Sequence, residues 1–191
     1  MQAVCFATNN LHKLEEVRSV LGSDFRVFSL DEIACKEELP ETGNTLEANA
    51  HQKANYVFDH YRQTCFADDT GLEVEALNNE PGVYSARYAG PQRNSEANID
   101  LLLSNLEGKE NRKARFRTVI CWVSEKETNY FEGIVEGEII GERRGTKGFG
   151  YDSVFVPTGY TKTFAEMTME EKNLLSHRSR AVNRLVEFLK G

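Results

Sequence analysis

Residues 114–140 read ARFRTVICWVSEKETNYFEGIVEGEII, and this stretch decides the fold class. Polar and apolar residues alternate through 114–124 and again through 128–140, and the charged triplet Glu125-Lys126-Glu127 separates the two runs. Alternation with a period of two residues is typical of β-strands, and a short polar break between two such runs favours a hairpin. The middle of the chain is therefore predicted to form two adjacent strands.

Strands and helices are interleaved on both sides of this hairpin. Before it, we expect strands at 2–8, 25–30 and 64–67, and helices at 11–21, from about 44, and at 95–106. Asn44 is the expected N-cap of the second helix, with Glu47 three residues later. After the hairpin, we expect a strand at 153–156, a capping box at Thr168-Met169-Glu170-Glu171 and a final amphipathic helix. This mixture predicts an α/β fold with a mixed β-sheet flanked by helices, because a hairpin does not belong to a purely parallel sheet.

Length and charge limit the classes of protein to which the chain can belong. Its 191 residues suit a single domain, 1–191, of one or two lobes. The formal net charge of -7 argues against a protein that coats a nucleic-acid polymer, which needs a basic face. No apolar run approaches the ~18 residues of a membrane span, and the first residues lack the basic segment of a signal peptide. We therefore expect a cytoplasmic protein with no membrane partner.

The four cysteines are Cys5, Cys35, Cys65 and Cys121. No two of them form a C-x-x-C pair, and three lie in apolar runs that we expect to be strands. We interpret them as small buried hydrophobic residues in a reducing compartment, in preference to zinc ligands or disulfides.

A first candidate for chemistry is Thr8-Asn9-Asn10-Leu11-His12-Lys13, between the first strand and the first helix. The N-terminus of a helix offers backbone N–H groups and a partial positive charge to a phosphate, and Lys13 adds a full charge one turn later. The alternative is a polar turn with a surface lysine. The segment is not a Walker A loop, since no G-x-x-x-x-G-K-[ST] pattern occurs.

A second candidate is Asp68-Asp69, which follows the short strand at 64–67. Carboxylates at the carboxyl end of a strand lie where open α/β sheets bind ligands. Mg²⁺ prefers one or two carboxylates together with water and phosphate oxygens, so Asp69 and either Glu41 or Glu38 form a possible magnesium site. The alternative is a turn in which both aspartates bond only to backbone N–H groups.

Two further candidates lie in the C-terminal third of the chain. The glycine-rich segment Gly145-Thr146-Lys147-Gly148-Phe149-Gly150-Tyr151-Asp152 offers a close backbone approach and aromatic rings that stack on a nucleobase, unless these rings pack in the core. Lys172 and Ser176-His177-Arg178-Ser179-Arg180 offer donors for an acceptor-rich base edge, unless they form a solvated helix start.

In this order and spacing the four candidates resemble the inosine triphosphate pyrophosphatase family, also described as dITP/XTP pyrophosphatases, over essentially the whole chain. The segments that carry the resemblance are Thr8-Asn9-Asn10-x-x-Lys13, Glu41-Thr42-Gly43, Glu47-Ala48-Asn49-Ala50 with Lys53-Ala54, Ala67-Asp68-Asp69-Thr70-Gly71-Leu72, Pro81-Gly82-Val83-Tyr84-Ser85-Ala86-Arg87-Tyr88, Gly148-Phe149-Gly150-Tyr151-Asp152 and Ser176-His177-Arg178. Two positions depart from the family's usual pattern. Asn9 stands where glycine is common, and Ser153 stands where proline is common. Neither departure removes a charged group.

The resemblance implies an elongated mixed sheet in two lobes with a central active-site cleft, a homodimer, and Mg²⁺-dependent hydrolysis of ITP, dITP and XTP to the monophosphate and pyrophosphate. It implies that Asp69 is the general base and that Asp69 and Glu41 hold Mg²⁺. Residues 8–13 would hold the triphosphate, with Thr70 and Lys53 nearby. The purine would be surrounded by Phe149, Gly150, Tyr151, Asp152, Lys172, His177 and Arg178.

Two other functions remain possible from the sequence. One is a related pyrophosphatase acting on modified pyrimidine nucleotides, and the other is a non-catalytic nucleotide-binding module. The acidic segments argue against the second, because a pure phosphate binder gains nothing from carboxylates without a metal. Attack at the α-phosphorus is expected, although the residues alone do not distinguish it from attack at the β-phosphorus.

Overall fold

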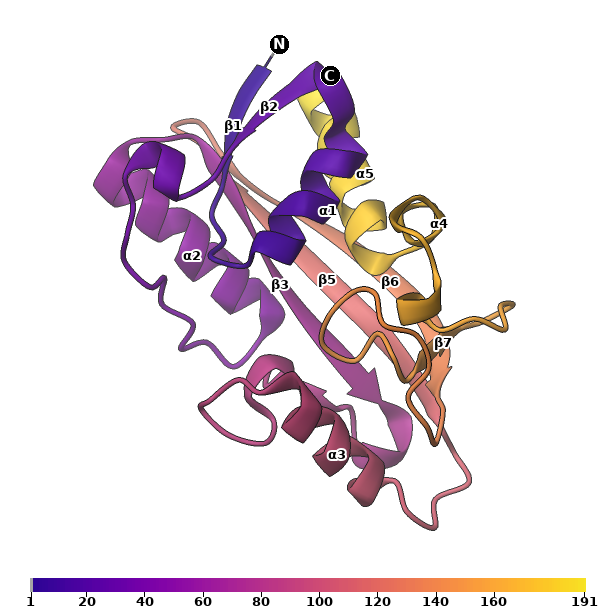
Figure 1. Ribbon diagram of the computed structural model, residues 1–191. Coiled ribbons are helices and arrows are strands. Elements are labelled where there is room, and N and C mark those ends of the chain that lie inside the picture. The colour runs from indigo at the N-terminus through magenta and orange to yellow at the C-terminus, as the bar shows by residue number, and fades with distance from the viewer. Residues whose placement is uncertain (1) are drawn as a thin grey trace. The chain divides into compact units, whose positions relative to one another are not determined.

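The computed structural model describes residues 2–191 (Figure 1). The strands are β1 (Gln2–Phe6), β2 (Phe25–Phe28), β3 (Cys65–Val74), β4 (Glu80–Gly82), β5 (Lys113–Val123), β6 (Thr128–Ile139) and β7 (Phe155–Pro157). The helices are α1 (Leu11–Leu21), α2 (Leu46–Tyr61), α3 (Ser95–Asn105), α4 (Met169–Asn173) and α5 (His177–Lys190). The α/β class is confirmed.

The strands form a sheet in the order β2-β1-β3-β5-β6-β7, with β4 paired to β3. β1 is parallel to both β2 and β3, whereas β4 is antiparallel to β3 and β7 is antiparallel to β6. The predicted hairpin is β5–β6, where the Ser124 N–H donates to the Glu127 carbonyl across the turn at 3.1 Å. The prediction of a mixed sheet is therefore confirmed.

The chain divides into two compact units. Unit 1 comprises the chain up to Asp69, Thr118–Gly133 and His177–Gly191, and unit 2 comprises Thr70–Arg117 and Ile134–Ser176. β3, β5 and β6 each contribute residues to both units.

Alternation along the strands of unit 1 gives this part of the sheet two apolar faces. Val4 and Phe6 of β1 and Phe66 of β3 pack with α1 and α5. Cys5 and Ala7, together with Cys65 and Ala67, face the opposite way and pack with α2. Because successive side chains of a strand point to opposite faces, the same strands bury two helical layers. Figure 1 shows α1 and α5 side by side on one of these layers.

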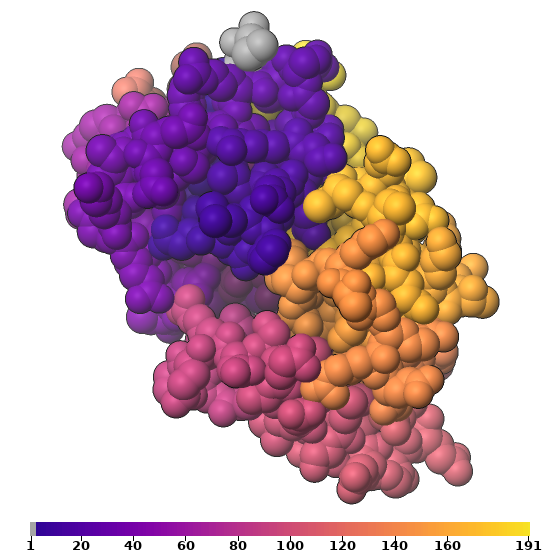
Figure 2. Space-filling model, viewed as in Figure 1, coloured from indigo at the N-terminus to yellow at the C-terminus, as the bar shows by residue number. Residues whose placement is uncertain are grey.

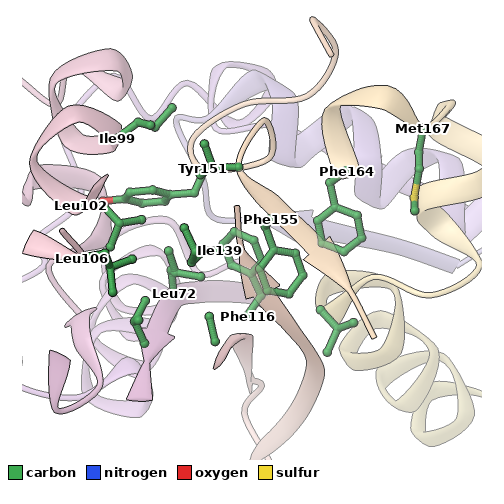
Figure 3. Packing of buried hydrophobic residues seen from close by; sticks show 14 of the residues in the cluster. Leu72, Ile99, Leu102, Leu106, Phe116, Ile139, Tyr151, Phe155, Phe164 and Met167 are labelled. Atoms are coloured by element: carbon green, nitrogen blue, oxygen red, sulfur yellow. The ribbon is translucent and has the colours of Figure 1, made fainter. Parts of the chain in front are cut away.

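Unit 2 is built around a cluster of aromatic residues. Phe116 lies 4.7 Å from Phe155 and 6.0 Å from Phe164 between ring centroids, and Phe155 lies 5.2 Å from Phe164. Figure 3 shows these three rings together, with Leu72 of β3 and Leu102 of α3 in the same cluster. This core anchors the segment 140–166, whose residues appear in orange on the surface in Figure 2.

Three predicted strands have other bounds in the structure, since β1 ends at Phe6, β2 ends at Phe28 and β7 covers Phe155–Pro157. Two further differences concern the site. The N-cap of α2 is Thr45, whose side chain accepts from the Ala48 N–H at 3.1 Å, and not Asn44. β3 also continues to Val74 instead of ending at 67, so Asp68-Asp69-Thr70-Gly71 lies within a strand. Gly71 passes close to the backbone of β4, where a Cβ would lie 2.7 Å from the Gly82 carbonyl oxygen. Glycine and aspartate are typical of turns, but here close packing and buried ionic partners keep them in the strand.

All four cysteines are buried and free, which confirms that they pack as small hydrophobic residues. Burial raises the pKa of the Cys5 thiol to about 12 and that of the Cys121 thiol to about 11. Among residues 2–191 no helix is both long enough and apolar enough to cross a membrane.

Candidate active site

The segment 8–13 connects β1 to α1 in unit 1 and forms the start of the helix. Asn10 is the N-cap, and its side chain accepts from the Lys13 N–H at 3.2 Å. The Asn10 N–H itself donates to the Thr8 hydroxyl at 3.1 Å. Leu11, the first residue of the helix, is 68% exposed, and Figure 2 shows the indigo residues of α1 at the surface. The helix N-terminus therefore faces solvent, as a phosphate-binding segment requires.

Asp68, in the middle of β3, is the centre of a buried ionic cluster. Its Oδ1 accepts from Lys13 Nζ at 2.9 Å, and its Oδ2 accepts from Arg178 Nε at 3.1 Å. Arg178 is 1% exposed and also donates from Nη1 to the carboxylate of Glu16 in α1. Burial alone would raise the pKa of Asp68, but Lys13 and Arg178 hold it well below its ordinary value. Asp68 is therefore a charged anchor between α1, β3 and α5.

Asp69 has different partners from its neighbour, as alternation along a strand requires. Its Oδ2 accepts from Asn49 Nδ2 of α2 at 3.0 Å. Burial raises the pKa of Asp69, and the repulsion of Glu41 adds to this rise, while Lys53 and Lys13 oppose it. A carboxylate with a raised pKa accepts a proton more readily, so Asp69 is the better candidate of the two for a general base.

The acidic loop at 41–43 is held by one face of α2. Lys53 Nζ lies 2.5 Å from Glu41 Oε1 and also donates to the Asp68 carbonyl at 2.7 Å. Burial opposes the charge on Lys53, but Asp69, Glu41 and Asp68 together raise its pKa. Lys53 thus stays protonated beside three carboxylates, where its positive charge can serve a phosphate.

Asp69 and Glu41 are the pair whose chemistry fits a magnesium ion. Both present carboxylate oxygens, and the charge on Glu41 acts on Asp69, a repulsion that a cation would relieve. Among residues 2–191 no group of three or more His, Cys, Asp or Glu side chains is placed to hold a metal. Two carboxylates still suit Mg²⁺, since it completes its octahedron with water and phosphate oxygens.

The start of α5 is fixed by close backbone packing. His177 Nδ1 lies 2.6 Å from the Thr118 hydroxyl of β5, and both residues are buried. Gly133 of β6 lies directly under this turn, where a Cβ would be 1.9 Å from the His177 carbonyl oxygen. Glycine at 133 therefore lets the turn that carries His177 and Arg178 lie against the sheet.

Unit 2 holds a second polar group, centred on Asp152. Its Oδ2 accepts from Lys172 Nζ at 2.7 Å and from the Phe149 N–H at 2.9 Å. Gly148 has φ +75°, and a Cβ there would lie 2.1 Å from this same oxygen. Lys172 Nζ lies 5.2 Å from the centroid of the Phe149 ring and 5.4 Å from that of Phe164, within the range of cation–π attraction.

Comparison with known proteins identifies the family. Residues 4–188 match the Ham1 family model.

The chain belongs to the Ham1 family.

Its relatives include the dITP/XTP pyrophosphatase of Flavobacterium psychrophilum, 51% identical over 191 residues with 100% of both chains covered. The dITP/XTP pyrophosphatase of Bacillus subtilis is 44% identical and covers 100% of this chain and 98% of its own length. The structure of the Staphylococcus aureus Ham1 protein superposes with a TM-score of 0.89 at 40% identity, covering 100% of this chain and 99% of its own.

The structure gathers the site residues predicted for this Ham1-family chain into two groups. Unit 1 brings Lys13, Glu41, Lys53 and Asp69 together around β3. Unit 2 brings Phe149, Asp152 and Lys172 together. Of the two candidate metal ligands, Glu41 rather than Glu38 is paired with Lys53 and acts on Asp69.

Three other predicted residues, Tyr151, His177 and Arg178, have surroundings that the sequence did not indicate. Tyr151 is 4% exposed and lies in the core of unit 2, where its hydroxyl donates to the Ser85 carbonyl at 2.8 Å. Arg178 donates to two buried carboxylates, and His177 lies against Thr118. Thr70 follows Asp69 in β3 and is half-buried.

The sequence assigned no role to Asn49, Gln52 or Glu16, although Asn49 lies in a segment that carries the resemblance. Asn49 and Gln52 precede Lys53 at helical spacing, and this polar stripe in an alanine-rich helix was a usable signal. Glu16 is 3% exposed although it lies in a charged surface-like segment, and only its distant partner Arg178 explains its burial.

Proposed function

We propose that this chain hydrolyses non-standard purine nucleoside triphosphates, such as ITP, dITP and XTP, to the monophosphate and pyrophosphate. The observation that carries the proposal is the buried Asp69 carboxylate, with a raised pKa and with Lys13 and Lys53 acting on it. This combination places a proton acceptor beside cations that suit phosphate oxygens. The names of the full-length relatives support the same reaction. We further propose a cytoplasmic homodimer, as in the family that the sequence resembles.

In the proposed mechanism, Asp69 takes the proton from the attacking water, which must lie within about 3 Å of its oxygen. Lys13 carries three N–H donors, so it can bind a phosphate oxygen while it donates to Asp68. The N–H groups at the start of α1 and the ammonium of Lys53 offset the charge of the leaving pyrophosphate. We propose attack at the α-phosphorus, which releases pyrophosphate in one step.

Asp69 and Glu41 would hold Mg²⁺ through their carboxylate oxygens. The ion supplies charge neutralisation of phosphate oxygens and orientation of the substrate. Lys53, which donates to Glu41, then keeps that carboxylate in place.

We propose that the purine is bound by the Asp152 group of unit 2. Phe149 is half-buried and offers an aromatic face for stacking. Lys172 donates to Asp152, and an ammonium donor at this position suits the 6-oxo acceptor of hypoxanthine or xanthine. Adenine presents an amino donor at that position, so its binding leaves donors facing each other.

The products test the reaction and its metal requirement. ITP with Mg²⁺ should give IMP and pyrophosphate in equal amounts, and excess EDTA should remove nearly all activity. Chromatography of the nucleotide, together with separate assays of pyrophosphate and orthophosphate, distinguishes the possible cleavages. IDP and orthophosphate as the main products would contradict the proposal.

A nucleotide panel tests the base preference. ITP, dITP and XTP should each exceed ATP by at least about a hundredfold in kcat/KM, because a mismatched donor in a desolvated pocket is costly. Modified pyrimidine triphosphates belong in the same panel, since they distinguish the related pyrophosphatase activity. Equal turnover of ATP and ITP would exclude the proposed role of Lys172.

A further inference from the structure

Asn49 connects two parts of the acidic group in unit 1. Its side-chain amide donates from Nδ2 to Asp69 Oδ2 at 3.0 Å, and its Oδ1 accepts from the Gly43 N–H at 2.7 Å. We propose that Asn49 is a positioning residue, which fixes the Asp69 carboxylate relative to the loop that carries Glu41. The proposal rests on the proposed function, because it takes Asp69 as the general base.

The two bonds determine the orientation of the Asn49 amide. The Gly43 N–H can only donate, so the atom facing it is the oxygen, and the nitrogen necessarily faces Asp69. Asn49 is 1% exposed, so water cannot replace either bond at low cost. The direction of the Asp69 carboxylate is thereby set from α2, a different element from the strand on which Asp69 lies.

Gly43 makes this arrangement possible because it has no side chain. A Cβ at Gly43 would lie 2.6 Å from Ala48 Cβ and 2.9 Å from Asn49 Oδ1. Both contacts are too short, so any other residue would push the loop away from the helix. The close approach brings the Gly43 N–H to the amide of Asn49.

The same face of α2 binds each residue of the loop in turn. Lys53 holds Glu41, the Gln52 amide oxygen accepts from the Thr42 N–H at 2.9 Å, and Asn49 holds Gly43. These three helix positions follow the i, i+3, i+4 spacing of one helical face. Asn49 also donates to the carboxylate of Asp69. It therefore relates the base to the loop that carries the second proposed metal ligand.

Asn49→Asp isolates the bond to Asp69. The new carboxylate has nearly the same shape and still accepts from Gly43, but it places an acceptor where Asp69 needs a donor. We expect kcat for ITP to fall about 10- to 100-fold with KM within about threefold, since the substrate contacts are unchanged. Asn49→Leu, which adds no charge, should lower kcat in the same range.

The same helix supplies a matched control. Asn55 Nδ2 donates to Asp59 Oδ2 at 2.8 Å, which is the same pair of groups on the exposed side of α2. Asn55→Asp should leave both kcat and KM within about twofold of the parent, because this pair is away from the acidic group. A loss of kcat in Asn55→Asp as large as in Asn49→Asp would overturn the proposal.

Stability measured in urea without metal gives a readout independent of activity. Asn49→Asp should lower the urea midpoint, because two carboxylates then face each other in a buried site. The double variant Asn49→Asp/Asp69→Asn exchanges the two groups and restores one N–H···O bond, so it should recover most of the loss while remaining inactive. If Asn49→Asp does not fold, recovery of folding in the double variant supports the hydrogen bond between positions 49 and 69 in the same way.

Two further results would overturn the proposal. One is a kcat for Asn49→Asp within twofold of the parent, and the other is a double variant no more stable than Asn49→Asp. An inactive parent enzyme would instead contradict the proposed function, and the urea series would still test the Asn49–Asp69 pair. The two failures are thus distinguishable.

Discussion

Asp69→Asn is expected to lower kcat for ITP by about a thousandfold or more, because proton acceptance and metal binding are lost together. The substitution keeps the shape of the side chain, and the new amide oxygen can still accept from Asn49 Nδ2. Steady-state kinetics with Mg²⁺ measure the loss. A variant with kcat near that of the parent would contradict the role of Asp69 as the general base.

The same variant should remain folded and should melt at a higher temperature than the parent when metal is absent. The folded state raises the pKa of Asp69, so the native protein retains this proton to a higher pH than the unfolded chain does. The protein therefore loses stability as the pH rises from the ordinary pKa of an Asp side chain through the raised pKa of Asp69. Asn at this position does not titrate, so the variant does not suffer this loss at neutral pH. Thermal melting at pH 4 and at pH 7 measures it. The advantage of Asp69→Asn should be present at pH 7 and diminish toward pH 4.

Arg178→Leu should lower the free energy of unfolding by about 3–5 kcal/mol, because it removes the cation from between two buried carboxylates. Arg178, Asp68 and Glu16 are each at most 3% exposed, so water cannot replace the lost charge. Urea unfolding of the metal-free protein at pH 7 measures the effect. Arg184→Leu is a control in the same helix, since Arg184 is exposed and donates to the Glu132 carbonyl. This control should lower the free energy of unfolding far less.

The pH dependence of Arg178→Leu provides a second comparison. In the parent, Lys13 and Arg178 hold the pKa of Asp68 below its ordinary value of about 3.9. That stabilisation is fully present at pH values above the ordinary Asp pKa, and it is lost as the pH falls through the depressed pKa of Asp68. Parent and variant should therefore differ most at neutral pH, and the difference should shrink progressively as pH falls below about 4. An equal difference at pH 7 and pH 3 would contradict the assignment.

Several elements could be predicted from local pattern because their signals are local. α1 begins and ends where the spacing of Leu14, Val17 and Leu21 predicts, and the capping box at Thr168 is present. The hairpin follows from its alternation and its polar turn. In contrast, the length of β3 depends on distant partners. Asp68 is held in the strand by Lys13, which lies 55 positions away in the sequence, and by Arg178, which lies 110 positions away. No local rule indicates such pairing.

The residues that make up the site were easier to predict than the hydrogen bonds and ion pairs that they form. The family resemblance indicated that Lys13, Lys53 and Asp69 belong together, and in the structure both lysines act on Asp69. It did not indicate that Asp68 would be the anchored carboxylate, because two adjacent aspartates are chemically equal until the strand directs them to opposite faces. The sequence likewise carried no signal for Glu16 or Thr118, since their partners Arg178 and His177 come near only on folding.

The partners of the Asp68 cluster are made at different times during synthesis of the chain. Asp68 and Arg178 are 110 residues apart, so at 5–20 residues per second the carboxylate leaves the peptidyl-transferase centre about 5–20 s before its guanidinium partner is made. Throughout that interval Asp68 and Glu16 lack the guanidinium that lies between them in the folded protein, although Lys13 is already present for Asp68. Because α5 belongs to unit 1, this unit cannot be completed before the last part of the chain is made. In a nascent chain that stops short of α5, burying Glu16 and Asp68 without their guanidinium partner is costly, which favours keeping both carboxylates hydrated until α5 is made.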